Sequence, residues 1–237
     1  MSRARKTITI ISLVILIFAL VFVVYKLFQV RKVTVTGCEA IAPQEVAEIT
    51  GIENGQSVFL IDTEAAIEAL NNDPRLKPLD IVITYPDRVT VSVEERKETA
   101  YVEKDGVLLA IDGECHVMRA VNNTSEPLYP RVFGLKMDTF DIGKRLGVGD
   151  TFQLDVLSRT LVGMADTGIG LYGIDVAWPA NIVVQTKDGY TVELGDDTRL
   201  NEKLSMAQKA IIELESRGFS GGVLDVSSVT KAYYREK

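Results

Sequence analysis

The hydrophobic positions near the N-terminus form one long run that no charged residue interrupts. Residues 8–25 contain no charge, no Gly and no Pro, and almost every position is apolar. A helix of this length rises about 27 Å, close to the roughly 30 Å hydrocarbon core of a bilayer. A buried core helix of this length normally keeps some polar positions. The run therefore predicts one transmembrane helix, which we place at residues 7–28.

Two other interpretations of the apolar run fit less well. A signal-peptide core is about 7–15 residues long and ends at a small-x-small cleavage site, whereas this run is longer and leads into Lys26, Leu27 and Phe28. Residues 35–38, Val-Thr-Gly-Cys, resemble a lipoprotein cleavage box, but three basic residues separate them from the apolar run. A retained membrane helix is favoured over a cleaved or lipid-modified leader.

The flanking charges do not orient the helix by themselves. Three basic side chains precede it and three follow it closely, so the positive-inside rule gives no preference from these counts. However, the short N-terminal tail also carries the α-amino charge, and long domains translocate largely regardless of their charge. We therefore expect residues 1–6 in the cytoplasm and the rest of the chain beyond the helix outside it.

Period-two and helical patterns alternate over the next 65 or so residues. Residues 33–37 predict a strand, and residues 42–51 a short helix with Pro43 in its first turn. Asp62 is the expected N-cap of a second helix that ends before Pro74. Two alternating segments then flank the turn at residues 85–88, which predicts a hairpin with one buried face. The order is strand, helix, helix, strand, strand.

The remaining residues predict a mostly antiparallel β domain with two packed helices, so the overall class is α+β. Asp-Gly dipeptides at 105–106, 112–113 and 188–189 separate short alternating segments, as in tight hairpins. Helical spacing of apolar residues appears at 151–166 and again at 200–214, where Gly218 follows. Residues 223–226 predict a last strand, which 229–234 could continue.

The charge balance argues against some classes of partner. The formal net charge is −7, and beyond residue 26 the chain carries 22 basic against 33 acidic side chains. An acidic domain does not favour nucleic acid or an anionic lipid surface as its main partner. Cys38 and Cys115 are the two cysteines, and a disulfide and two unpaired thiols are equally compatible with this pattern.

Residues suited to catalysis are few. Asp112, Cys115 and the single histidine, His116, could suggest a metal site, but neighbours on a strand point to opposite faces. Residues 168–173 match Gly-x-Gly-x-x-Gly, yet they follow a helix and precede a strand, the reverse of a dinucleotide site. The charge run at 94–98, Glu-Glu-Arg-Lys-Glu, could hold a carboxylate pair, but solvated charge at a strand end is the favoured interpretation. We expect no enzyme, no cofactor and no metal.

Several segments are similar to one known family in the same order. The most specific is residues 85–97, Tyr-Pro-Asp-Arg-Val-Thr-Val-Ser-Val-Glu-Glu-Arg-Lys, and others are Ile-Asp-Gly at 111–113, Tyr-Pro-Arg-Val-Phe-Gly at 129–134 and Val-Leu-Asp-Val at 223–226. Over nearly its whole length the chain resembles the FtsQ/DivIB family of bacterial cell-division proteins. Glu98 stands where the family usually has Pro, and residues 227–237 are only loosely similar.

The resemblance implies a domain plan. It is a cytoplasmic tail at 1–6, a transmembrane helix at 7–28, a POTRA domain (β-α-α-β-β) at 29–97, the family's β domain at 98–230 and a C-terminal tail at 231–237. It also implies a single-pass protein of the cell membrane, located at the division septum. The family's role is that of a non-enzymatic divisome scaffold, which binds FtsB/DivIC- and FtsL-type proteins and through them influences septal peptidoglycan synthases.

The resemblance also implies where partners bind. The expected mode is strand addition at the edge of the last strand. The residues expected there are Val226, Ser227, Ser228, Val229 and Thr230, with Tyr233 and Tyr234 as aromatic anchors; a frayed polar tail is the alternative for the two tyrosines. A second docking surface is expected on the hairpin strand with Val89, Val91 and Val93. The alternative function is a membrane-tethered POTRA chaperone or transport-associated module, which would need repeated POTRA units or a barrel-forming region.

Overall fold

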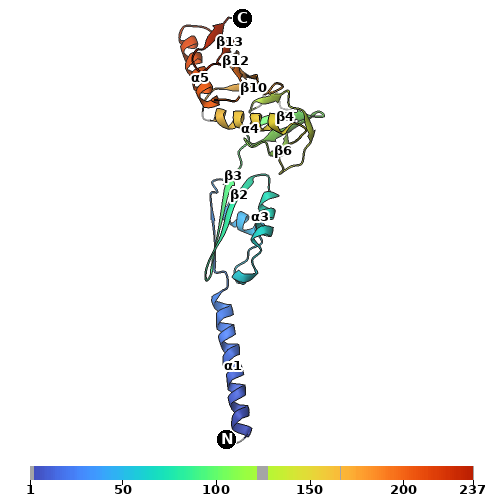
Figure 1. The fold of residues 1–237 in the computed structure, drawn as a ribbon, viewed down its shortest axis with the longest axis vertical. Coiled ribbons are helices and arrows are strands. Elements are labelled where there is room, and N and C mark those ends of the chain that lie inside the picture. Colours follow the sequence, from blue (N-terminus) through green and yellow to red (C-terminus); the bar gives the residue numbers. More distant parts are fainter. Residues whose placement is uncertain (1–2, 122–127, 166, 237) are drawn as a thin grey trace. The chain divides into compact units, whose positions relative to one another are not determined.

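The computed structural model describes residues 3–121, 128–165 and 167–236 (Figure 1). Residues 1 and 2 of the expected cytoplasmic tail and residue 237 of the expected C-terminal tail lie outside this range. Internal contacts divide the chain into two units, Met1–Glu95 and Arg96–Lys237. The α+β class predicted from the sequence is confirmed.

The N-terminal apolar run forms helix α1 (Arg3–Leu27). Its segment Thr9–Leu27 is long and apolar enough to cross a membrane, and within the described residues it is the one helix that meets this description. None of this segment is buried inside the protein, which is the opposite of what a core helix would show. The helix fits a single-pass membrane protein.

The rest of the first unit has the predicted strand-helix-helix-strand-strand order, with one extra turn of 3-10 helix. Asp62 caps α3 as expected, because its Oδ1 accepts the Ala65 N–H at 3.0 Å. The elements are β1 (Lys32–Thr36), α2 (Pro43–Ile49), η1 (Val58–Leu60), α3 (Thr63–Asn71), β2 (Leu76–Thr84) and β3 (Arg88–Glu95).

Strand β3 lies in the middle of the three-stranded sheet, whose order is β1-β3-β2. It pairs antiparallel with β2, as the hairpin requires, and parallel with β1. Gly37, which directly follows β1, lies so close to β3 that an added Cβ would lie 1.8 Å from the Val93 carbonyl oxygen. Only glycine fits there. Helices α2 and α3 contribute Val46, Ala66 and Leu70 to the core beneath the sheet.

The second unit is built on one sheet of nine strands, in the order β14-β13-β12-β11-β10-β7-β4-β5-β6. The pairs β4–β7, β7–β10 and β12–β13 are parallel, and the other neighbours are antiparallel. The strands of this sheet are β4 (Ala100–Lys104), β5 (Val107–Ile111), β6 (Val117–Val121), β7 (Arg131–Phe133), β10 (Leu171–Asp175), β11 (Ile182–Thr186), β12 (Tyr190–Gly195), β13 (Gly222–Asp225) and β14 (Tyr233–Arg235).

Two helices and a small two-stranded sheet complete the second unit. The helices are α4 (Thr151–Ala165) and α5 (Leu200–Ser216), and the small sheet pairs β8 (Met137–Thr139) with β9 (Gly147–Val148). Leu204 and Ala207 of α5 share a continuous core with Val192 of β12 and Leu224 of β13, and α5 lies beside these strands in Figure 1. This packing fixes β13, and β13 in turn carries β14.

Candidate partner-binding surfaces

The terminal strand of the large sheet is β14, which pairs with β13 on one side. The register aligns Leu224 with Tyr234. The Val226 N–H donates to the Glu193 carbonyl of β12 at 2.9 Å. Because the backbone N–H and C=O groups of successive residues point to alternate sides of a strand, those of Leu224 also point toward β12. Leu224 and Tyr234 therefore form a non-hydrogen-bonded pair, and the N–H and C=O of Tyr234 point to the outer edge.

The two tyrosines of β14 have different environments. Tyr234 is half-buried: its hydroxyl donates to the Gly221 carbonyl at 3.0 Å, and its ring lies edge-on to Phe219 at 5.5 Å between centroids. Gly222, at φ +115°, lets this ring approach, since an added Cβ would lie 2.6 Å from it. Tyr233, by contrast, is 59% exposed. Tyr234 thus holds the edge strand in place, and Tyr233 offers an aromatic surface beside it.

The expected contact strand at Val226, Ser227, Ser228, Val229 and Thr230 is wrong in its secondary structure. Val226 is fully buried, and residues 227–230 form bends and turns. Asp225 Oδ1 accepts the Ser227 N–H at 2.9 Å and its hydroxyl at 2.7 Å, and the Ser228 and Thr230 hydroxyls lie 2.8 Å apart. These hydrogen bonds from Ser227 lower the pKa of Asp225.

The sequence does contain a signal for this turn. Residues 225–230 are Asp-Val-Ser-Ser-Val-Thr, and Asp, Ser and Thr side chains favour local hydrogen bonds to the backbone over a strand ladder. The free edge of the sheet therefore begins later than expected, at Tyr233.

The second docking surface is also corrected by the structure. Val89, Val91 and Val93 lie on the central strand β3 with at most 1% exposure, and their side chains form the core of the first unit. A strand with neighbours on both sides has no free edge, so it cannot take up another strand. The outer edges of this sheet belong to β1 and β2, and β2 carries the exposed side chains Leu79 and Val82.

The charge run at 94–98 is only partly solvated: Glu94 and Lys97 are exposed, whereas Glu95 and Arg96 make structural contacts. The Glu95 carboxylate accepts the backbone N–H groups of Glu39, Ala40 and Ile41 at 2.7–2.9 Å. It therefore fixes the segment that leads into α2. Arg96 begins the second unit, and its side chain is 9% exposed.

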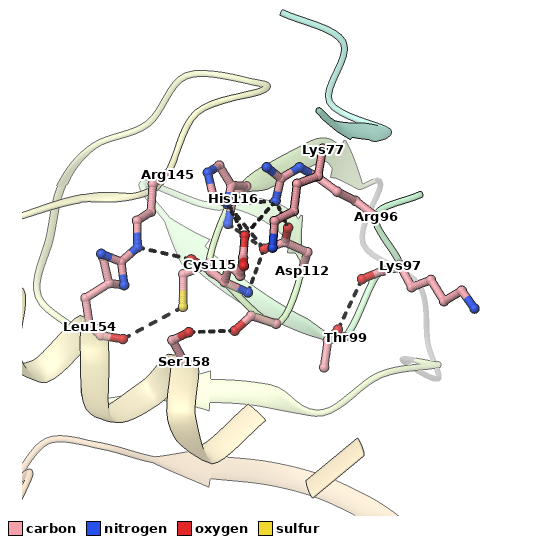
Figure 2. Close-up of polar contacts among 12 residues, drawn as sticks. Lys77, Arg96, Lys97, Thr99, Asp112, Cys115, His116, Arg145, Leu154 and Ser158 are labelled. Atoms are coloured by element: carbon pink, nitrogen blue, oxygen red, sulfur yellow. Dashed lines mark hydrogen bonds and ion pairs between the residues drawn. The ribbon is translucent and has the colours of Figure 1, made fainter. Parts of the chain in front are cut away.

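Arg96 lies at the centre of a small ion-pair network, shown in Figure 2. Its Nη1 donates to Asp112 and lies 3.3 Å from Glu114 Oε2 and 3.0 Å from His116 Nδ1. Asp112 also accepts the backbone N–H of His116 at 2.8 Å. These bonds tie the start of the second unit to the β5–β6 turn.

The same three side chains come close enough to suggest a metal site. Ligand atoms of Asp112, Glu114 and His116 all lie within 4.8 Å of one another. However, the Arg96 guanidinium already contacts each of them, so a cation fills the position that a metal would take. Cys115, part of the metal set considered from the sequence, faces the Leu154 carbonyl instead, and burial raises its pKa to about 12. Both cysteines are free thiols.

Comparisons with known proteins agree with the resemblance found in the sequence. The family model "POTRA domain, FtsQ-type" matches residues 28–96. A cell division protein DivIB of Clostridium tetani is 23% identical over 219 residues, which cover 90% of this chain and 82% of that protein. A cell division protein FtsQ of an Anaeromyxobacter species is 24% identical over 203 residues, which cover 85% of this chain and 68% of that protein.

One solved structure also matches, at a level too low to support an argument. It is the major extracytoplasmic domain of the cell division protein DivIB from Geobacillus stearothermophilus, with a TM-score of 0.32 and 15% identity, covering 51% of this chain and 96% of that one. The assignment depends instead on the matched POTRA domain and on relatives that span most of the chain. On that evidence, this chain contains a POTRA domain of the FtsQ type and is similar over most of its length to bacterial cell-division proteins named DivIB and FtsQ.

Proposed function

We propose that this chain is a non-enzymatic divisome scaffold that binds FtsB/DivIC- and FtsL-type proteins outside the membrane. Its N-terminus lies in the cytoplasm, and the domains that follow α1 act on the outer side at the division septum. Through these partners it helps to control septal peptidoglycan synthesis, and the synthases are contacted only indirectly. The relatives are named as cell division proteins, which favours this role over the POTRA chaperone or transport alternative.

The observation that supports strand addition is the outer edge of β14. The backbone N–H and C=O of Tyr234 point away from β13, and such groups at a sheet edge can pair with an incoming strand. Main-chain pairing supplies affinity, whereas side chains that flank the edge supply specificity. Tyr233, exposed beside this edge, is the best-placed anchor, since aromatic residues dominate interface hot spots.

A binding titration tests the proposal. The ectodomain of residues 29–237 is titrated with the FtsB/DivIC-type ectodomain of the same organism, beside Tyr233→Ala and a version that ends at Lys231. Ending at Lys231 removes β14 but keeps the buried Val226 and the turn that follows it. We expect the truncation to abolish binding and Tyr233→Ala to weaken it by about 30-fold, the effect of a hot spot worth roughly 2 kcal/mol.

Tyr172→Ala is the matched control. Tyr172 lies on β10 in the same sheet, and at 52% exposure it is almost as exposed as Tyr233. This variant should bind like the unaltered ectodomain. Equal binding by all versions would refute strand addition at β14 and move the contact to the first unit, where β2 offers an outer edge. No binding by any version would contradict direct recognition by the folded units.

A further inference from the structure

Within the first unit, the region that adjoins the C-terminal end of α1 carries a cluster of exposed apolar side chains. Phe59 and Leu60 on η1 are 62% and 74% exposed, and Tyr85 in the β2–β3 turn is 59% exposed. Phe28, the residue directly after α1, packs with them. We call these four residues the aromatic tip. Large apolar side chains gathered at one place on a surface commonly mark an interaction site.

The three rings of the aromatic tip form one contact group. Phe28 lies 5.0 Å from Phe59 and 6.2 Å from Tyr85 between ring centroids, and Phe59 lies 5.9 Å from Tyr85. The residues come from three separate segments of the chain, so this grouping is a product of the fold. Spacings of 4.5–7 Å are those of favourable aromatic pairs.

Backbone hydrogen bonds hold the aromatic tip at the end of the membrane helix. The Phe28 N–H donates to the Val24 carbonyl at 3.1 Å, which carries the helical pattern of α1 to Phe28. The Phe28 carbonyl in turn accepts the Val58 N–H at 3.0 Å, and the Val30 N–H donates to Gln56 at 2.8 Å. Neither η1 nor its two exposed side chains can move far from the last turn of α1 while these bonds are made.

The depth of the aromatic tip follows from the length of α1. Its apolar segment Thr9–Leu27 has 19 residues and spans about 28 Å, so Leu27 lies at the border of a hydrocarbon core roughly 30 Å thick. Each headgroup zone beyond that border is about 5–8 Å thick. Since Phe59 and Tyr85 lie within 6.2 Å of Phe28, their rings come within reach of this zone.

The charges around the aromatic tip suit the same environment. Lys26 lies in the last turn of α1, and Arg31, Lys32 and Arg88 are exposed on the segments that flank the tip. Asp87 is the acidic partner of two of them, at 3.8 Å from Arg31 and 3.9 Å from Arg88. These four basic residues and Asp87 together carry a net positive charge, although the chain as a whole is acidic. Aromatic side chains beside Lys and Arg are typical of membrane interfaces.

We propose that the aromatic tip inserts into the headgroup–acyl boundary of the leaflet at which α1 ends. The lipid surface thereby covers Phe59, Leu60 and Tyr85, and it orients the first unit against the membrane rather than leaving it on a free tether. This inference concerns the lipid bilayer and does not depend on the strand-addition proposal.

Fluorescence quenching in lipid nanodiscs tests the proposal on the full chain. Trp178, the single tryptophan, is replaced by Phe, and a probe is introduced as Phe59→Trp or, independently, Leu60→Trp. Leu79→Trp is the matched control, because Leu79 is an exposed apolar residue of the same unit at 58% exposure. It lies six residues before Tyr85, roughly 20 Å along β2.

We expect blue-shifted emission from both tip probes, severalfold stronger quenching by brominated lipids than at Leu79→Trp, and protection from aqueous iodide. The control should show strong iodide quenching and little effect of the brominated lipids. Because the control also places Trp at an exposed apolar site, an intrinsic preference of Trp for membranes does not explain a difference. Tip probes that iodide reaches as freely as the control, with no quenching by brominated lipids, would overturn the proposal.

Discussion

Tyr234 should determine whether the edge strand β14 is present for a partner to bind. Tyr234→Phe removes the hydroxyl that donates to the Gly221 carbonyl at 3.0 Å, which costs about 1 kcal/mol. Tyr234→Ala removes this bond, the ring contact with Phe219 worth about 1 kcal/mol and part of the apolar burial of a half-buried ring, about 1 kcal/mol more. The total for Tyr234→Ala is about 3 kcal/mol.

These costs convert into the opening equilibrium of the strand. A loss of about 1 kcal/mol increases the open population about fivefold, and a loss of about 3 kcal/mol increases it more than 100-fold. Amide hydrogen exchange of Tyr233 and Arg235, whose N–H groups face β13, measures this opening directly. We expect exchange to accelerate in the order Tyr234→Phe, then Tyr234→Ala, while the amides of β12 keep their protection because they lie deeper in the sheet.

The comparison with Tyr172→Ala tests the reasoning. Tyr172 is exposed on β10, so its loss should change protection at Tyr233 and Arg235 by less than about 0.5 kcal/mol. If Tyr234→Ala left the exchange of β14 unchanged, the half-buried ring would not be what holds the strand. If it accelerated exchange equally in β12 and β14, the edge would not open as a separate step.

Three further perturbations follow from named contacts. Arg96→Met leaves the buried carboxylate of Asp112 without its guanidinium partner and should lower the free energy of unfolding by about 3 kcal/mol; a loss below about 1 kcal/mol in urea unfolding would contradict this. The Lys203 ammonium, 3% exposed and 2.7 Å from Asp196, holds the pKa of that carboxyl at about 2. Asp196 therefore contributes stability that is complete above its ordinary pKa near 4 and is lost as the pH falls toward 2. Lys203→Met should raise the pKa of Asp196 in an NMR titration. An unchanged titration would refute the pairing. Gly222→Ala adds a Cβ that collides with the edge strand at φ +115° and should cost about 1–3 kcal/mol, which faster hydrogen exchange of β14 would reveal and unchanged protection would rule out.

Local patterns in the sequence predicted the elements that depend on neighbouring residues. The apolar run became α1 because its composition alone decides which solvent it prefers. Asp62 became an N-cap, and Pro43 became the first residue of α2, because both effects act within one turn. The hairpin of β2 and β3 formed around its turn for the same reason.

The corrections arose where the outcome depended on residues far away in the sequence. The alternation at 89–93 correctly predicted a strand, but its exposure depended on β1, which pairs with β3 from 56 residues earlier. Within the charge run at 94–98, Glu95 and Arg96 were not recognised as structural, because their partners are the amides at 39–41 and the carboxylate of Asp112. No local period reveals such pairings.

The sequence by itself determined the long apolar N-terminal helix, the α+β class, the strand-helix-helix-strand-strand domain and the resemblance to DivIB and FtsQ proteins. These follow from hydrophobic periodicity, capping residues and ordered motifs, which are properties of neighbouring positions. Only the tertiary structure decided which strand edges remain open, because an edge is open only where no neighbouring strand pairs with it. The tertiary structure likewise gathered Phe28, Phe59 and Tyr85 from three segments at the end of α1, a grouping that requires the chain to fold back on itself.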